Sequence, residues 1–151
     1  MSKVESADLI LKLYDLRREP KMREARNWIF GFNPTSVDEY FKTMMDPEVG
    51  GLLRMVTSYW DMAASLVNHG AIDAEMFADT AGEHMFVFAK VQPILADLRE
   101  RFQNPRAFYH LEKVIMDHPN GAEMLAKTKE MIKVINEQMA AGQGRGALLV
   151  R

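Results

Sequence analysis

The chain of 151 residues contains no cysteine. This absence excludes disulfides, thiolate metal ligands and cysteine nucleophiles. It suits a reducing compartment, and the first residues lack the apolar centre and cleavage site of a signal peptide, so we expect a cytoplasmic protein. A single domain of this length buries enough apolar surface to fold without cross-links.

Long apolar runs and an excess of one charge are also absent. The nearest approach to 18 consecutive apolar residues, 85–96, is interrupted by Lys90, Gln92 and Pro93. We therefore expect a soluble protein with no membrane span. Nineteen basic side chains stand against twenty-one acidic ones. This balance lacks the basic field of a typical nucleic-acid binder, and we do not expect nucleic acid as a partner.

The residues that dominate the sequence are strong helix formers. Ala, Leu, Met, Glu, Lys and Arg fill segments that are separated mostly by the six prolines and nine glycines. No segment alternates apolar and polar residues as a half-buried strand would. We predict an all-α fold, a single-domain bundle of about seven or eight helices, several of them short. This domain should span residues 1–141, and residues 142–151 should form a flexible C-terminal tail.

Capping and helix-breaking residues place the expected helices at about 6–18, 20–30, 37–44, 47–68, 73–78, 84–102, 104–117 and 122–141. Pro93 predicts a kink within the sixth of these. Apolar residues of the fourth recur at three- and four-residue spacing, so they share one face. We expect this helix to be central, with Trp60 in the core.

Three segments resemble a family of bacterial helical domains that carries only an unknown-function label. The segment 59–77, YWDMAASLVNHGAIDAEMF, combines an aromatic pair, an acid, small and aliphatic residues at helical spacing, and a glycine turn before Ile-Asp. Segment 13–28 places arginines before an R-x-x-R-x-W run, and in segment 93–101 a proline precedes Leu-Arg-Glu-Arg. The resemblance covers about residues 9–115 and implies an α-helical fold. It implies no activity and no catalytic residue.

The residue spacings of catalytic and metal sites are missing. None of His69, His84, His110 and His118 has an acid three residues earlier or a His-x-x-x-His partner, so we expect no metal site and treat them as surface or helix-end residues. The glycine clusters lack phosphate-loop spacing, and no serine elbow occurs. The twelve methionines indicate adaptable packing rather than copper binding. We expect no catalytic residue and no cofactor, and we favour a protein that is not an enzyme.

A basic cluster near the start of the chain is the candidate anion site. Arg23 and Arg26 lie on neighbouring turns of an expected helix and, with Arg18, could bind a phosphate. The alternative is a solvated face, because Glu19 and Glu24 interrupt the cluster.

The last expected helix carries the candidate subunit interface. Leu125, Ile132, Ile135 and Met139 follow a short heptad-like spacing. The same stripe could instead pack on the helix's own bundle.

Two hypotheses for function follow. The first is a non-enzymatic helical interaction or assembly module, as a homo-oligomer, first of all a dimer, or with another protein partner. The alternative is a small-molecule or anion-binding helical domain whose site is assembled from distant residues, for example where a kinked sixth helix opens a pocket.

Overall fold

The computed structural model describes residues 2–142, and within this range it is helical without any strand. The elements are α1 (Lys3–Leu16), α2 (Pro20–Ile29), α3 (Val37–Met44), α4 (Gly50–Asn68), α5 (Ala74–Thr80), α6 (Glu83–Val91), the 3₁₀ turn η1 (Gln92–Ile94), α7 (Leu95–Arg101), α8 (Tyr109–Met116) and α9 (Gly121–Ala140). They confirm the predicted single all-α domain. Of the predicted tail, residues 142–151, only Gly142 lies among the described residues.

Side-chain caps begin four of the helices. Ser2, Glu19, Ser36 and Asp73 each accept a hydrogen bond from the backbone N–H three residues later. Such a cap satisfies one of the amide groups that a helix start leaves without an intrahelical partner. The start of α1 also has the reciprocal bond, from the N–H of Ser2 to the Glu5 carboxylate.

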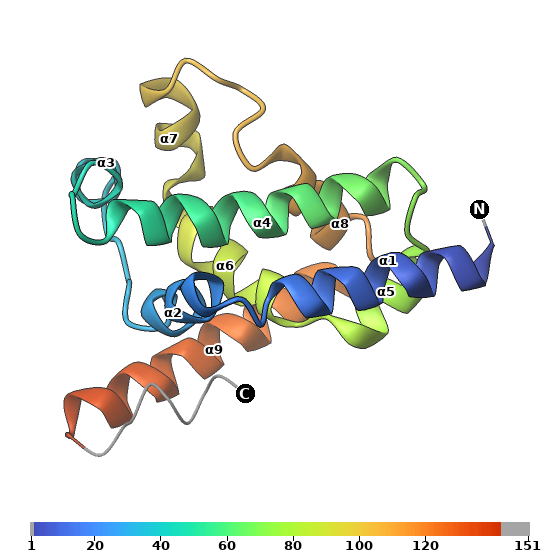
Figure 1. Ribbon diagram of the computed structural model, residues 1–151. Coiled ribbons are helices and arrows are strands. Elements are labelled where there is room, and N and C mark those ends of the chain that lie inside the picture. Colours follow the sequence, from blue (N-terminus) through green and yellow to red (C-terminus); the bar gives the residue numbers. More distant parts are fainter. Residues whose placement is uncertain (1, 143–151) are drawn as a thin grey trace.

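The central position predicted for the fourth helix is confirmed. α4 crosses the middle of the bundle (Figure 1), with its most extensive contacts to α2 and α8. Its apolar face is buried, and Trp60 is 1% exposed. The Tyr59 hydroxyl donates to the Leu13 carbonyl and thereby ties α1 to α4.

At Pro93 the predicted long helix is divided into two separate helices. A proline in a helix has no N–H to donate and crowds the preceding turn. The chain accordingly passes from α6 through η1 into α7, where we had expected one bent helix.

The next helix starts later than predicted, at Tyr109 rather than near residue 104. Contacts from α7 and α4 hold the turn before this helix and its first turn. Arg99 donates from Nε to the Ala107 carbonyl, the Asp61 carboxylate accepts from the N–H of Leu111, and Phe108 adopts a left-handed backbone with φ of 58°.

The last helix packs along only part of its length. α9 contacts α6 and α8, and its C-terminal half extends outward in Figure 1. Asn136 still reaches the α2–α3 loop, where its side chain exchanges hydrogen bonds with Asn33. No helix within residues 2–142 has the length and apolar character needed to cross a bilayer.

Candidate ligand-binding site

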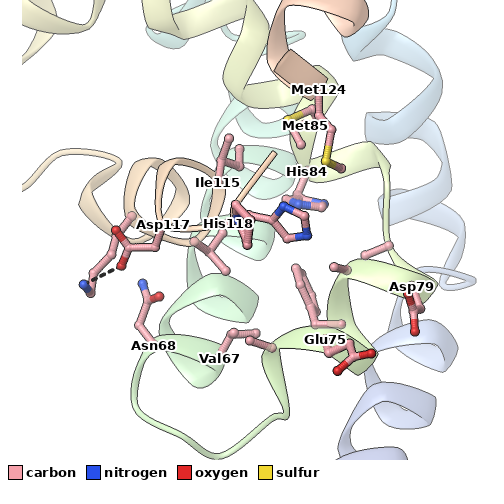
Figure 2. A pocket seen from close by; sticks show the side chains of 17 residues that line it. Val67, Asn68, Glu75, Asp79, His84, Met85, Ile115, Asp117, His118 and Met124 are labelled. Carbon is pink, nitrogen blue, oxygen red and sulfur yellow. Dashed lines mark hydrogen bonds and ion pairs between the residues drawn. The ribbon is translucent and has the colours of Figure 1, made fainter. Parts of the chain in front are cut away.

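A cavity of about 780 Å³ lies between the C-terminal end of α4, α5, the start of α6, α8 and the start of α9 (Figure 2). Its volume falls in the range of roughly 300–1,000 Å³ that is usual for small-molecule sites. Most of the wall is apolar. The larger apolar side chains are Val67, Phe77, Met85, Val114, Ile115 and Met124.

A close backbone approach shapes one side of this cavity. Gly121 begins α9 directly against the end of α8, and a Cβ atom at this position would overlap the carbonyl oxygen of Ile115. Only glycine permits this contact without displacing a helix. The contact brings Met124 of α9 and Ile115 of α8 to the same wall.

His84 is the buried polar group of the cavity. Its imidazole lines the cavity (Figure 2) and contacts the rings of Phe77 and Trp60, at centroid distances of 4.9 and 5.9 Å. The residue is 5% exposed, and Nδ1 has no hydrogen-bond partner. Burial lowers the pKa of His84 to about 4, so its imidazole is neutral at neutral pH.

His118 faces the same cavity from the turn between α8 and α9 (Figure 2). Its Nδ1 lies 3.1 Å from the backbone nitrogen of Asn120. A backbone N–H can only donate, so Nδ1 accepts this bond and Nε2 carries the hydrogen. His118 therefore offers the cavity a donor, and its Nε2 is not arranged as a lone-pair ligand for a metal.

The mouth of the cavity carries charged side chains. Glu75 and Asp79 of α5 line it, and Lys113 and Asp117 of α8 form a salt bridge of 2.7 Å. No group of three or more His, Asp and Glu side chains within residues 2–142 is placed to hold a metal ion.

A family model described as "Domain of unknown function (DUF4760)" matches residues 3–117, more than half of the chain. The chain belongs to this family. The predicted resemblance to a family with an unknown-function label is thereby confirmed. The match ends at the edge of the cavity, because His118, Pro119 and Met124 of its wall follow residue 117. No curated protein and no solved structure matches the chain.

The predicted anion-binding arginines of this DUF4760 domain do not converge. Arg26 turns inward, is 6% exposed, and pairs through Nε with both carboxylate oxygens of Glu83, at 3.1 and 2.9 Å. Arg18 and Arg23 are exposed. Arg23 and Arg26 lie one turn apart on α2, but Arg26 is buried, and Glu83, 57 residues away, already neutralises its charge. An anion site at these arginines stays a prediction, and only Arg18 and Arg23 of the three are exposed.

The residues of the predicted interface stripe on α9 also differ in burial. Leu125 is 7% exposed in the chain's own core, and Ile132 packs against that core. Leu125 therefore packs within its own chain, because α6 and α8 contact α9, and a subunit contact along α9 stays a prediction. Ile135 and Met139 are half-buried.

Sequence reasoning missed both imidazoles as site residues. It treated His84 and His118 as surface or helix-end residues, yet His84 begins the apolar segment HMFVFA. A histidine in such a segment is a sign of burial, because its neighbours on the helix face the core. Nothing in the local sequence indicates that His118, 34 residues later, faces the same cavity.

Proposed function

We propose that this domain binds a small, mainly apolar molecule in the cavity between α4, α5, α6, α8 and α9. One observation carries the proposal: the buried imidazole of His84 lines this cavity, and its covered Nδ1 has no hydrogen-bond partner. A buried polar group without a partner costs about 1–3 kcal/mol, and nearly all such groups in folded proteins are paired. A ligand with a polar end would offset this cost at the imidazole.

The lining of the cavity suits binding. Most of its area is apolar, and Met85 and Met124 supply flexible thioether side chains that adapt to irregular ligands. None of the described lining residues carries a hydroxyl group. Covalent catalysis by a hydroxyl group therefore has no nucleophile here. Carboxylates, imidazoles and Lys113 also line the cavity, and we propose that they serve binding and not a reaction.

A fluorescent probe tests the proposal. N-phenyl-1-naphthylamine is uncharged and apolar, and its emission rises when it leaves water. We expect saturable binding of one probe per chain. Ala78→Phe would fill the cavity from α5 and should weaken this binding by about tenfold or more, the effect of losing about 1.4 kcal/mol.

The matched control is Ala96→Phe, which adds the same side chain at an exposed position of α7 outside the cavity. It should bind the probe like the unchanged protein. Absence of saturable binding, or equal binding by both variants, would reject the cavity as the ligand site.

Exposed apolar side chains on α1 favour a second candidate function, assembly into a homodimer. Val4, Leu11, Tyr14 and Leu16 are 50–72% exposed. Clusters of exposed large apolar residues are typical of protein interfaces. A cytoplasmic location, which the absence of cysteine suits, stays a prediction.

The charged side chains beside Leu11 and Tyr14 fit a second copy of the chain. Asp8, Lys12, Asp15 and Arg18 alternate in sign along the groove that Leu11 and Tyr14 line on α1. Two antiparallel copies of such a helix can oppose acid to base. Light scattering should show a dimer that Leu11→Glu converts to a monomer. A monomer at all concentrations before mutation would exclude this assembly.

A further inference from the structure

We infer, resting on the proposed function, that the ligand of this cavity is an uncharged molecule with a hydroxyl or carbonyl oxygen at one end of an apolar body. Three observations lead to this ligand class: the fixed hydrogen of His118, the unpaired imidazole of His84, and the acidic mouth of the cavity.

His118 requires an acceptor from the ligand. Because the N–H of Asn120 occupies Nδ1 at 3.1 Å, the remaining ring nitrogen, Nε2, is the donor. Hydroxyl and carbonyl oxygens accept such a bond. An ammonium group has no lone pair and cannot.

His84 adds a neutral imidazole in a dry setting. A neutral imidazole donates from one nitrogen and accepts at the other. A hydroxyl group also does both, so it can pair with the imidazole in either tautomer. A carboxylate would have to give up its water beside a 5% exposed ring that carries no compensating positive charge.

The charges at the mouth oppose an anion further. Asp117 is neutralised by Lys113, at 2.7 Å. Glu75 and Asp79 have no salt-bridge partner among residues 2–142. Lys3 interacts with the charge of Glu75 from α1 without a salt bridge. The two carboxylates still repel a negative ligand, and they do not act on an uncharged one.

Three probes with the same apolar tail separate these ligand classes. Octan-1-ol, octanoate and octylammonium are each used to displace N-phenyl-1-naphthylamine at pH 7.5. We expect octan-1-ol to compete most strongly and octanoate to be weaker by about fivefold, since two nearby exposed charges contribute on the order of 1 kcal/mol. Octylammonium is attracted by Glu75 and Asp79. It should still fall below octan-1-ol, because it cannot accept from His118 and its ammonium group must give up its water beside the neutral, buried His84.

Variants connect each result to its residues. In Glu75→Gln/Asp79→Asn, octanoate should gain about fivefold in affinity while octan-1-ol stays unchanged. In His118→Phe, octan-1-ol should lose about fivefold, and the naphthylamine probe should still bind.

The possible failures are distinguishable. If the naphthylamine probe does not bind, the proposed function itself is wrong. If it binds and octanoate or octylammonium displaces it best, the cavity is a ligand site and the inferred class is wrong. If the double variant leaves the octanoate affinity unchanged, Glu75 and Asp79 do not repel anions, and their assigned role is wrong.

Discussion

His84 and Lys90 stand near opposite ends of α6 as buried basic side chains, 5% and 6% exposed, but only one of them has partners. The Lys90 ammonium donates to the carbonyl oxygens of Phe30 and Phe32 and to Oδ1 of Asn33, at 3.3, 2.9 and 2.8 Å. His84 Nδ1 has no partner.

Burial lowers the pKa of both groups, that of Lys90 to about 8 and that of His84 to about 4. At neutral pH Lys90 therefore remains mostly charged inside its cage of oxygens, while His84 is neutral beside a cavity. A buried base that the fold surrounds with acceptors joins helices together. A buried base without partners remains available to another molecule.

The largest expected effect concerns a third buried base, Arg26, which like Lys90 has partners within the chain. Glu83→Gln would leave the Arg26 charge buried and uncompensated. We expect a loss of about 3–5 kcal/mol in the free energy of unfolding, measured by urea denaturation with far-UV circular dichroism.

The control for this prediction is Glu112→Gln. Its partner Arg99 forms a salt bridge of the same length, 2.9 Å, in a more exposed setting. Exposed pairs contribute little, so the loss should stay below about 1 kcal/mol. Equal losses in the two variants would show that the burial of Arg26 does not matter.

The next largest effect is a dependence of stability on pH through His84. Below pH 6.5 the unfolded chain binds a proton at this imidazole that the folded chain does not take up until about pH 4. The free energy of unfolding should therefore fall as the pH is lowered from 6.5 to 4, by about 3 kcal/mol from this group.

His84→Phe isolates this contribution. Urea denaturation at pH 4, 5, 6 and 7 should show a shallower loss in the variant than in the unchanged protein. Parallel curves would mean that His84 is protonated in the folded state like an exposed histidine.

The smallest expected effect is the difference in the free energy of unfolding between variants that lack one or the other of these two bases, Lys90 and His84, at pH 7.5. Lys90→Met leaves the buried carbonyl groups of Phe30 and Phe32 without their donor, and we expect a loss of about 2 kcal/mol. His84→Phe removes no hydrogen bond and should change stability by less than about 1 kcal/mol. A larger loss in His84→Phe than in Lys90→Met would reverse the distinction between the two ends of α6.

Local patterns made most of the fold predictable. The face of α4 follows from apolar spacing, and the starts of α3 and α5 follow from Ser36 and Asp73, because periodicity and capping act within a few residues. The late start of α8 could not be predicted in this way. This start depends on Asp61, whose carboxylate accepts from the N–H of Leu111, 50 residues later.

The candidate site was less predictable than the fold. Arg26 looked like a surface charge because its partner is 57 residues away, and the distance in sequence between His84 and His118 conceals their shared cavity. The alternative hypothesis anticipated a pocket assembled from distant residues. It gave the expected kink as one possible place for that pocket, whereas Pro93 does not line the cavity.

The tight joint at Gly121 has a consequence for how this chain can vary. In a saturation library, turn positions usually accept most amino acids, and Pro119 and Asn120, both exposed, should do so. Gly121 should accept no other amino acid unless α9 moves, because even alanine would force α9 away from the Ile115 carbonyl. Any substitution recovered there should come with a reshaped cavity wall, since Met124 moves with the same helix. A change of ligand preference could then arise at a residue that never touches the ligand.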